Sequence, residues 1–384
     1  MTGTAPARSG GRPSARARAV LLQCALVAAL FAAAAWLVGN VVQNFAALDK
    51  GFGFSFLWRL PANYDINQTL IAYSSANTHL RAALVGLLNT LAVAAAGIVA
   101  ATVLGFLVGA LRLSRNWLAS RLAAIYVEVT RNTPVLLFVL LWHAVLIAAL
   151  PAPRNAIDLG GVAYLSNRGA HLPRLVGGPD LWHLLLALAL GSLTAFAVLR
   201  LVRARGRYLA AAAAGIAVLS TFLALAGPLP AIELPELRGF NFAGGTTLIP
   251  EFVALAWALA FYTSGFIAEI VRAGILSVDR GQGEAARALG LGEGQTMRLV
   301  VLPQALRAIV PPLTSEYLSL TKNSSLAIAI GYMDLVATLG GITLNQTGRE
   351  MEAMILVMGV YLAISALIAF LMNRYNARLG RIYG

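Results

Sequence analysis

Four consecutive polar residues interrupt an otherwise apolar run that covers residues 309–330. They are Lys322, Asn323, Ser324 and Ser325, and their ammonium, carboxamide and hydroxyl groups are able to bind a polar or anionic molecule. An ionisable residue in a membrane span is costly, so it usually faces the interior of a helix bundle or a water-filled path. The cluster, near the middle of its run, therefore predicts the lining of a path across the membrane or a break in the helix. A lysine that snorkels to the interface is the alternative.

Two further polar groups lie at the ends of apolar runs. Glu269 and Arg272 stand three residues apart at the end of the run 252–270, and Arg131, Thr133 and Pro134 stand at the start of the run 134–150. Proline suits the first turn of a helix, where its missing N–H is harmless. An interfacial salt bridge and a helix start explain these residues as well as direct contact with a substrate does.

Catalytic chemistry is not indicated by the sequence. An enzyme would need clustered groups at catalytic spacing, whereas the histidines are scattered at positions 79, 143, 171 and 183. The single cysteine, Cys24, excludes an intrachain disulfide and a cysteine-based metal cluster. The sequence has no G-x-x-x-x-G-K-[ST] loop for nucleotide phosphates. We expect no catalytic residue, no metal and no cofactor in this chain.

A polar, glycine-punctuated loop covers residues 279–305, with the sequence DRGQGEAARALGLGEGQTMRLVVLPQA. One helical face at its start is formed by residues spaced i, i+3, i+4 and i+7, namely Gln282, Ala285, Ala286 and Leu289. Glycines between residues 290 and 294 end that helix, and a second helical pattern runs to Pro303. The small face suits docking in a protein groove. An amphipathic helix resting on lipid is the alternative, but it would favour bulky apolar residues on that face.

The elements that carry these residues are predicted to be membrane-spanning helices. Hydrophobic residues make up 59% of the chain and charged residues only 12%, which is too apolar for a soluble domain. Runs near the length needed to cross a bilayer predict about eight spans, at residues 20–39, 84–111, 134–150, 181–201, 209–226, 252–270, 309–330 and 354–371. The expected fold is an all-α polytopic membrane protein. In the second of these spans, Gly105 and Gly109 form a small-xxx-small pair that would let another helix approach.

The net charge of +13 raises two alternatives, nucleic-acid binding and a topology signal. The arginines stand between apolar runs, which favours the topology signal. With eight crossings, most of the 29 lysines and arginines fall on the side that also holds the N-terminus and the polar loop. That side is therefore predicted to be cytoplasmic, with both termini. The first apolar run is longer than the core of a secretory signal and has no A-x-A-like site after it, so an uncleaved span is favoured over a cleaved signal peptide.

The polar loop resembles the EAA loop in the permease subunits of ATP-binding-cassette importers. The spacing from Glu284, Ala285 and Ala286 through Gly290 to Val300, Val301, Leu302 and Pro303 matches, with Val300 where that family usually has isoleucine. The stretches EVTRNTPVLL at 128–137, AEIVRAGILSVDRGQGEAARALGL at 268–291 and LPQALRAIVPPLTSEYLSLTKNSSLAIAIGYMDL at 302–335 are similar to the polar-amino-acid permease family. The resemblance implies that an ATPase docks on Gly281, Glu284, Ala285, Ala286, Arg287, Gly290, Leu302 and Pro303.

The chain is longer than the five-helix core that is usual in that family. The resemblance covers residues 81–150 and 250–371, and implies a type I importer core made of the second, third, sixth, seventh and eighth spans. The expected organisation adds a cytoplasmic N-terminus at 1–18, an extra span and periplasmic loop at 19–80, and an insert with two spans at 151–249. The second part of the core is placed at 250–372, with a cytoplasmic tail at 373–384. This layout, with GFGFSFLW after the first span, is most similar to the first permease of general L-amino-acid importers of Gram-negative bacteria.

The resemblance implies a non-catalytic subunit in a bacterial inner membrane that moves polar or general L-amino acids from the periplasm to the cytoplasm. The implied partners are a cytoplasmic ATPase dimer that binds the ATP, a homologous second permease and a periplasmic amino-acid-binding protein. Lipid is the surrounding solvent, and no nucleic acid is expected. An amino-acid transporter driven by an ion gradient is the alternative. It predicts discontinuous helices in two inverted halves and carboxylates in the membrane, whereas the sequence has one polar interruption and no convincing repeat.

Overall fold

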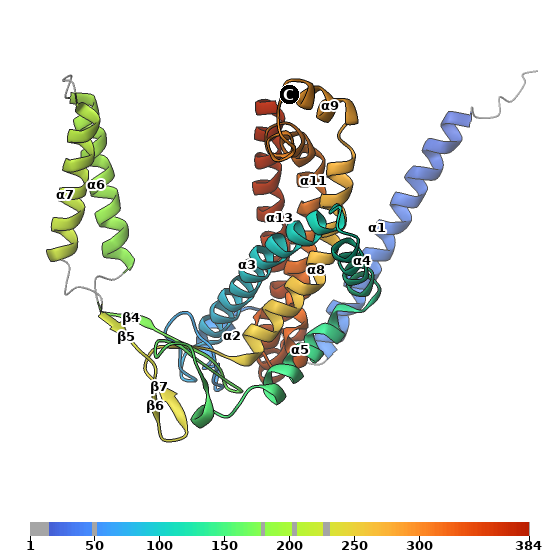
Figure 1. Ribbon diagram of the computed structural model, residues 1–384. Coiled ribbons are helices and arrows are strands. Elements are labelled where there is room, and N and C mark those ends of the chain that lie inside the picture. The colour runs from blue at the N-terminus through green and yellow to red at the C-terminus, as the bar shows by residue number, and fades with distance from the viewer. Residues whose placement is uncertain (1–14, 48–51, 178–180, 202–205, 226–230, 384) are drawn as a thin grey trace, which may run out of the picture. The chain divides into compact units, whose positions relative to one another are not determined.

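The computed structural model describes residues 15–47, 52–177, 181–201, 206–225 and 231–383 (Figure 1). Four arginines that contribute to the predicted charge asymmetry, at positions 8, 12, 203 and 205, lie outside the described residues. The chain divides into two units, residues 1–57 and residues 58–384, and each is described by itself.

The first unit contains the helix α1 (Ala15–Ala47). Its apolar side chains point in all directions, and Leu22, Phe31 and Trp36 are each more than half exposed. A helix that is apolar all round suits a lipid environment. The segment Arg18–Asn44 is long and apolar enough to cross a membrane, and the predicted first span at residues 20–39 lies within it.

The second unit begins within the short helix α2 (Phe56–Arg59) and is built around a bundle of long helices. The helices α3 (His79–Arg112), α8 (Pro250–Leu276) and α13 (Glu350–Tyr383) are each long and apolar enough to span a membrane. The helices α4 (Trp117–Asn132) and α5 (Val135–Ala149) pass the same test together, but they are bent by 109°. The bend falls at Thr133 and Pro134, because the backbone before a proline is driven out of the helical region.

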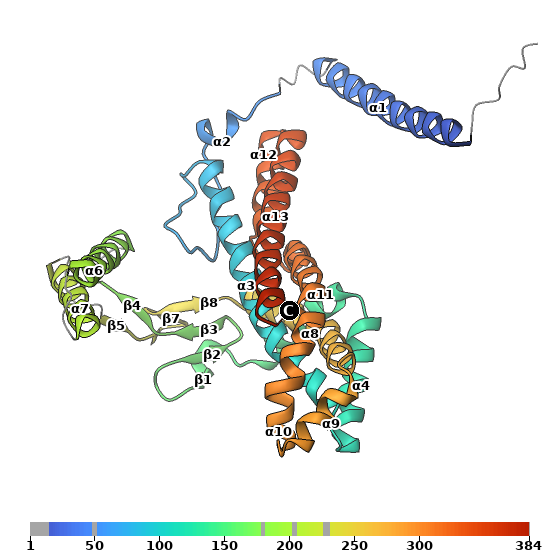
Figure 2. The ribbon, with the colours of Figure 1, turned by 90° about the horizontal axis from the view of Figure 1, so that it is seen from above.

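The helices α3 and α8 pack closely along their lengths. A Cβ atom added at Gly105 would lie 2.5 Å from Ile267, and one at Gly109 would lie 2.9 Å from Val271, so only glycine permits this approach. The small-xxx-small pair therefore serves the helix contact that its spacing predicts. Figure 2 shows α11 (Leu302–Asn323) and α13 beside these helices, and α11 packs against both α8 and α13.

The region of the predicted seventh span, residues 309–330, is not one continuous α-helix. The helix α11 starts earlier, at Leu302, and after Asn323 the chain winds more tightly as the 3₁₀-helix η3 (Ser324–Ile330). Gly331 then takes a left-handed conformation with φ of 77°, which ends the helix. A π-helix η4 (Val336–Thr343) and the short α12 (Leu344–Thr347) lead to α13.

The insert contains an antiparallel helix pair, α6 (Leu181–Leu201) and α7 (Arg207–Leu225). Both coincide closely with the predicted spans at 181–201 and 209–226. A Cβ atom added at Gly191 would lie 2.9 Å from the Gly215 carbonyl oxygen, and the reverse contact has the same distance. These two glycines let the helix backbones touch. The stretches Leu186–Arg200 and Arg207–Phe222 are apolar but shorter than the four full-length candidate spans.

Short strands, which were not predicted from the sequence, flank this helix pair along the chain. A four-stranded antiparallel sheet has the order β1 (Ile157–Asp158), β2 (Tyr164–Ser166), β3 (Gly169–Leu172) and β8 (Thr246–Leu248), and it follows the 3₁₀-helix η1 (Pro153–Asn155). Two further two-stranded antiparallel sheets pair β4 (Arg174–Val176) with β5 (Ala231–Glu233), on either side of the helix pair in sequence, and β6 (Glu236–Arg238) with β7 (Asn241–Ala243). Because β8 runs directly into α8, this sheet is fixed to the start of a core helix. The all-α membrane fold is confirmed, with this small sheet as an addition.

Candidate functional site

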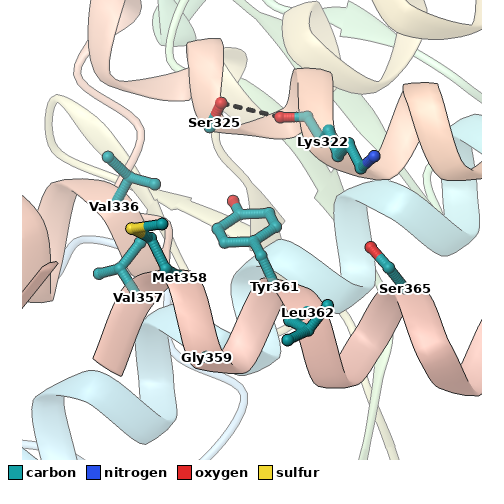
Figure 3. Close-up of a pocket in the computed structure, with 9 residues that line it drawn as sticks. All are labelled: Lys322, Ser325, Val336, Val357, Met358, Gly359, Tyr361, Leu362 and Ser365. Carbon is teal, nitrogen blue, oxygen red and sulfur yellow. Dashed lines mark hydrogen bonds between the residues drawn. The ribbon is translucent and has the colours of Figure 1, made fainter. Parts of the chain in front are cut away.

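An open cleft of about 590 Å³ lies between the end of α11 and α13 (Figure 3). Lys322 and Ser325 line one wall, and Tyr361 points across from α13, where Ser365 also contributes. The remaining lining residues are apolar or lack a side chain: Val336, Val357, Met358, Gly359 and Leu362. One ammonium group and three hydroxyls among apolar side chains form an arrangement typical of pockets that orient a small polar molecule.

The four polar residues predicted as one cluster do not share one surface. Lys322 is exposed and Ser325 half-buried at the cleft, whereas Ser324 is fully buried and donates a hydrogen bond to the Thr321 carbonyl at 2.7 Å. Asn323 is half-buried and is not among the cleft residues. The predicted break in the helix is confirmed, but it lies at the end of α11 rather than in the middle of an α-helical span. Serine hydroxyls that bond back to the preceding turn favour such a change in winding.

Residues 331–335 form a largely buried connection beside α3, in which residues 331–334 are not helical. The side-chain amide of Asn89 donates to the Met333 carbonyl at 2.9 Å, and the Thr90 hydroxyl accepts from the Leu335 N–H at 3.1 Å. Asn89 and Thr90 are both fully buried. Backbone that leaves the helix inside an apolar bundle must find partners there, and α3 supplies them.

Asp334 lies at the centre of this connection and is fully buried. One carboxylate oxygen accepts from the Ala337 N–H at 2.8 Å, which caps the start of η4, and the other accepts from the Tyr361 hydroxyl at 3.4 Å. The carboxylate therefore joins the broken region to the wall of the cleft. Asn89, Thr90 and Asp334 were not predicted as functional residues, although Asn89 and Thr90 are two adjacent polar residues inside the predicted span 84–111.

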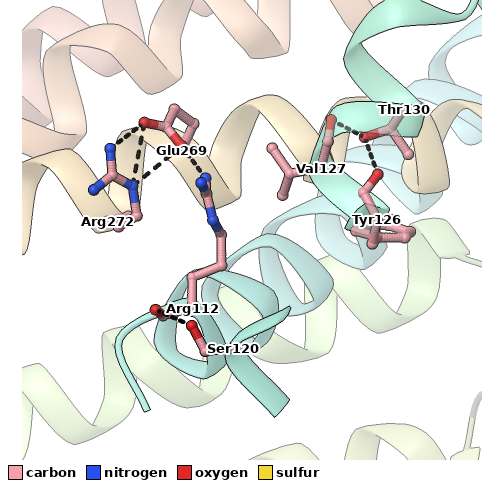
Figure 4. Close-up of polar contacts among 7 residues, drawn as sticks. All are labelled: Arg112, Ser120, Tyr126, Val127, Thr130, Glu269 and Arg272. Atoms are coloured by element: carbon pink, nitrogen blue, oxygen red, sulfur yellow. Dashed lines mark hydrogen bonds and ion pairs between the residues drawn. The ribbon is translucent and has the colours of Figure 1, made fainter. Parts of the chain in front are cut away.

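Glu269 joins two core helices near the polar-loop end of α8 (Figure 4). It forms an ion pair with Arg272 at 2.6 Å, as their spacing predicts, and a second ion pair with Arg112 at the last turn of α3. Arg112 is in turn held at the corner between α3 and α4, where the Ser120 hydroxyl donates to its carbonyl at 3.0 Å. This geometry is that of a salt bridge between helices at the end of the bundle.

Of the predicted residues at the bend between α4 and α5, Arg131 contacts another core helix, whereas Pro134 is exposed. Thr133 is the C-cap residue of α4. Pro134 is the N-cap residue of α5 rather than part of its first turn. The Arg131 guanidinium lies 5.6 Å from the centre of the Phe266 ring, and its charge acts on the Glu316 carboxylate of α11. Glu316 was missed by the sequence analysis, although a carboxylate inside the run 309–330 was visible there.

The polar loop folds as the sequence pattern predicts, with helix, glycine turn and second helix. The helix α9 (Arg280–Ala288) is capped by Asp279, whose carboxylate accepts from the Gly281 N–H at 3.1 Å. Gly290 follows with φ of 83°, and its N–H donates to the Arg287 carbonyl at 2.9 Å. The helix α10 (Glu293–Thr296) and the π-helix η2 (Met297–Val301) then lead into α11, where Leu302 and Pro303 stand in the first turn.

The predicted small face of α9 is divided between the interior of the loop and its surface. Ala286 is buried together with Gly283, against the side of Thr296. Gly281, Gln282, Glu284, Ala285, Arg287 and Leu289 are exposed, and Leu289 has 84% of its surface free. Leu289 is the C-cap residue of α9 and is an isolated apolar side chain on an otherwise polar, exposed surface.

Side-chain contacts tie the loop back to the bundle. The Gln304 amide on α11 donates to the Gln282 side chain at 3.3 Å. Arg115, just after α3, forms an ion pair with Glu293 of α10 at 2.6 Å. The loop is thus held by its two chain ends and by the corner between α3 and α4.

These features define a class of protein: a polytopic α-helical membrane subunit with a polar cleft in its bundle and a helical loop that presents an exposed face at one end. Residues 208–381 match the family described as "Binding-protein-dependent transport system inner membrane component". The chain is 43% identical over 376 residues to the general L-amino acid transport system permease protein AapQ of Rhizobium johnstonii, covering 95% of this chain and 93% of AapQ. It is 44% identical over 402 residues to the glutamate/glutamine/aspartate/asparagine transport system permease protein BztB of Rhodobacter capsulatus, covering 94% and 93%.

The chain belongs to this family of inner-membrane permease subunits of binding-protein-dependent transport systems. Both relatives match over nearly their whole length, the insert included. Membership favours the importer permease over a transporter driven by an ion gradient.

Proposed function

We propose that this chain is the permease subunit of an ATP-driven importer that moves L-amino acids from the periplasm to the cytoplasm. The observation that carries the proposal is the exposed face of α9 in a chain that has no nucleotide-binding loop of its own. A subunit that moves substrate without binding ATP must receive mechanical work through a protein contact. The exposed Ala285 and Leu289 offer a small apolar surface for that contact, framed by the charged Glu284 and Arg287.

The amino-acid substrate is supported by the relatives, whose names give general L-amino acids and the pair glutamate and aspartate with their amides. The cleft suits such molecules, because an ammonium group at Lys322 complements a carboxylate and the three hydroxyls are able to accept or donate. We propose that the substrate passes this cleft. Glu316 and Arg131 then supply charge farther along the same bundle.

A second permease subunit is needed to complete this path. Lys322 is exposed at an open cleft between core helices, and a lysine in that position is unfavourable against hydrocarbon. A homologous permease that covers the cleft would leave the lysine facing water and substrate instead. Whether the pair consists of two copies or of two different permeases, the same surface of α13 and η3 would be shared.

The distribution of basic residues supports an orientation with the polar loop in the cytoplasm. The last turn of α3, the α3–α4 corner and the polar loop carry Arg112, Arg115, Arg121, Arg280, Arg287 and Arg298. Positive charge beside spans favours the cytoplasmic side. The sheet of the insert, joined to the opposite end of α8, then faces the periplasm, where a binding protein would deliver the substrate.

The test is association of the assembled permease with its ATPase. Gly290→Pro is expected to lower ATPase co-purification and transport by about thirtyfold or more, because proline cannot adopt the positive φ that ends α9 and the exposed face would be displaced. Glu284→Lys should act in the same direction by reversing a charge on that face. Gly294→Ala is the matched control, since a Cβ atom there meets no atom of the described residues within 4 Å.

Membrane insertion of each variant is checked by its recovery in the membrane fraction. If Gly290→Pro and Glu284→Lys insert normally and bind the ATPase as the unaltered chain does, the docking role of the loop is wrong. If Gly294→Ala loses the ATPase as well, the loss is not specific to the α9 face.

A further inference from the structure

The insert meets the core at the junction between β8 and α8. The backbone N–H of Ile249 at this junction donates to the side-chain oxygen of Gln68 at 3.3 Å. Gln68 belongs to the segment before α3 and is 9% exposed. The sheet is held tightly at this point, because Gly169 of β3 lies so close to the Leu248 carbonyl that a Cβ atom could not fit. Movement of the sheet is therefore transmitted to Ile249 and to its partner.

Gln68 is connected in turn to the broken region beside the cleft. Its backbone carbonyl accepts from the Asn89 side-chain amide at 2.9 Å, and the same amide donates to the Met333 carbonyl at 2.9 Å. The two backbone groups that face the Asn89 amide are carbonyl oxygens, which only accept hydrogen bonds, so the nitrogen of the amide must point toward them. The Asn89 amide oxygen is buried without a hydrogen-bond partner among the described residues. A buried polar atom without a partner is destabilising, so the two hydrogen bonds from the Asn89 nitrogen must offset that cost.

The connection ends at the cleft. Met333 is followed by Asp334, whose carboxylate accepts from the Tyr361 hydroxyl at 3.4 Å, and Tyr361 is part of the cleft wall. Asp334 and Asn89 are fully buried, so neither contact is exchanged for bulk water when it shifts. A displacement at one end of a closely packed polar network is therefore carried along it rather than absorbed locally.

We propose that Gln68, Asn89 and Tyr361 are positioning residues through which the insert sets the shape of the substrate cleft. The insert thereby acts as a periplasmic lever on the path, in addition to the action of the ATPase at the opposite end of the bundle. The inference rests on the proposed function, since it takes the cleft to be the substrate path and the insert to face the periplasm. It assigns a role to the insert that a five-helix core has no means to perform.

The test uses the reactivity of a cysteine placed in the cleft wall of the assembled importer. Leu362→Cys in a Cys24→Ser background gives this subunit a single thiol beside Tyr361, and its rate of reaction with a water-soluble maleimide is followed on the band of this subunit. Gln68→Met keeps the volume but removes the acceptor for Ile249. Ile249→Pro removes the donor from the other side, and it fits because Ile249 already has φ of −62°.

Both variants are expected to change the reaction rate of the introduced thiol by about twofold or more, in the same direction, the range that couplings between distant sites span. Adding Tyr361→Phe, which removes the last bond, should abolish the effect of Gln68→Met. Arg154→Ala is the matched control, because Arg154 packs on Phe240 inside the insert and does not contact Gln68. It should leave the rate unchanged.

Equal rates in the unaltered chain, Gln68→Met and Ile249→Pro, including no reaction in any of them, would overturn the proposal. It would also fail if Arg154→Ala changed the rate as much as Gln68→Met, or if the effect of Gln68→Met stayed at full size with Tyr361→Phe. Should Gln68→Met not be recovered from membranes, Ile249→Pro decides alone. The labelling needs neither ATP nor transport, so its failure is separate from a failure of ATPase docking at Gly290.

Discussion

The polar loop and the buried connection at residues 331–335 both interrupt the helices of the core, and they satisfy their polar groups in opposite ways. In the loop the partners are near in sequence: Asp279 caps Gly281, and the side chain of Gln295 accepts from the Gly292 N–H. In the connection, partners that are distant in sequence are added to the local cap at Ala337, and Asn89 and Met333 are separated by 244 positions. The loop leaves most of α9 exposed, whereas Asp334 is fully buried.

This difference separates two tasks. A loop that completes its own hydrogen bonds keeps its shape while its outer face stays free, which is what a docking element needs. A connection whose groups are completed by α3 and α13 keeps its shape only while those helices stay in place. The first region is therefore suited to receive force, and the second is suited to report the arrangement of the helices around the cleft.

The largest effect is expected where a side chain is forced into the buried connection. Gly86 of α3 faces this region, and a Cβ atom there would lie 2.7 Å from the Asp334 carbonyl oxygen and would collide with the Thr338 hydroxyl. Gly86→Val should lower the free energy of unfolding by about 3 kcal/mol or more. In a thermal unfolding scan of the purified subunit this is a drop of about 6 °C or more.

A matched substitution is available in α1. In the part of the chain that the structure describes, a Cβ atom at Gly39 meets nothing within 4 Å, so Gly39→Val should leave the unfolding temperature within a degree or two of the unaltered chain. Equal unfolding temperatures for Gly86→Val and Gly39→Val would mean that α3 does not pack on residues 334–338 as described.

The same contrast determines which parts of the molecule were predictable from sequence. The order of helix, glycine turn and second helix in the loop was predicted, because the helical face at Gln282–Leu289 and the glycines from Gly290 act within a few residues of each other. The burial of Ala286 inside the loop was not predicted. Helices at the eight predicted segments followed from their apolar runs, although the seventh changes its winding after Asn323 and the helix α4 was not predicted. The role of Asn89 and Asp334 did not follow, because it depends on the packing of α3 against a segment far along the chain. The strands of the insert were missed because each has only two to four residues, too few for a periodic pattern.

Lys322 shares a feature with each region. Its side chain is exposed, like most of α9, but it lines the cleft together with Tyr361, which contacts the buried connection. Lys322→Ala should lower transport by about tenfold or more, the size expected for the loss of a charge-assisted hydrogen bond to a substrate carboxylate. Lys322→Arg should retain part of the rate. Asn323→Ala is the neighbouring control, because Asn323 does not line the cleft. Unchanged transport in Lys322→Ala, with a cysteine at 322 that aqueous thiol reagents cannot reach, would remove the cleft from the path.

The stability of the insert is expected to depend on pH, because a histidine is buried in its sheet. His171 is 2% exposed, and its ring nitrogens lie 3.1 Å from the Ser166 hydroxyl and 2.9 Å from the Thr247 hydroxyl. Burial holds the pKa of His171 below its ordinary value of 6.5. The unfolded chain therefore binds more protons below about pH 6.5, and the insert should lose stability as the pH falls, by at most about 1.4 kcal/mol per pH unit.

Limited proteolysis of the insert at pH 7.5 and at pH 5.5 measures this loss. His171→Gln keeps a polar side chain but does not titrate, so cleavage in that variant should depend less on pH. A variant with the full pH dependence of the unaltered chain would assign the effect to another group.

The smallest effect is expected at the ion pair between Arg115 and Glu293, which joins the loop to the corner after α3. Their side chains are 87% and 67% exposed, and exposed pairs contribute only about 0.2–1 kcal/mol. Arg115→Glu and Glu293→Arg should each lower the free energy of unfolding by no more than this amount. The double variant with exchanged charges should recover most of it. In about 1 M salt, where charges are screened beyond roughly 3 Å, the coupling should vanish. A coupling energy above about 2 kcal/mol that persists in high salt would contradict this expectation. It would mean that the loop is fixed to this corner as firmly as the buried connection is fixed to α3. The two regions would then not differ in how freely they move.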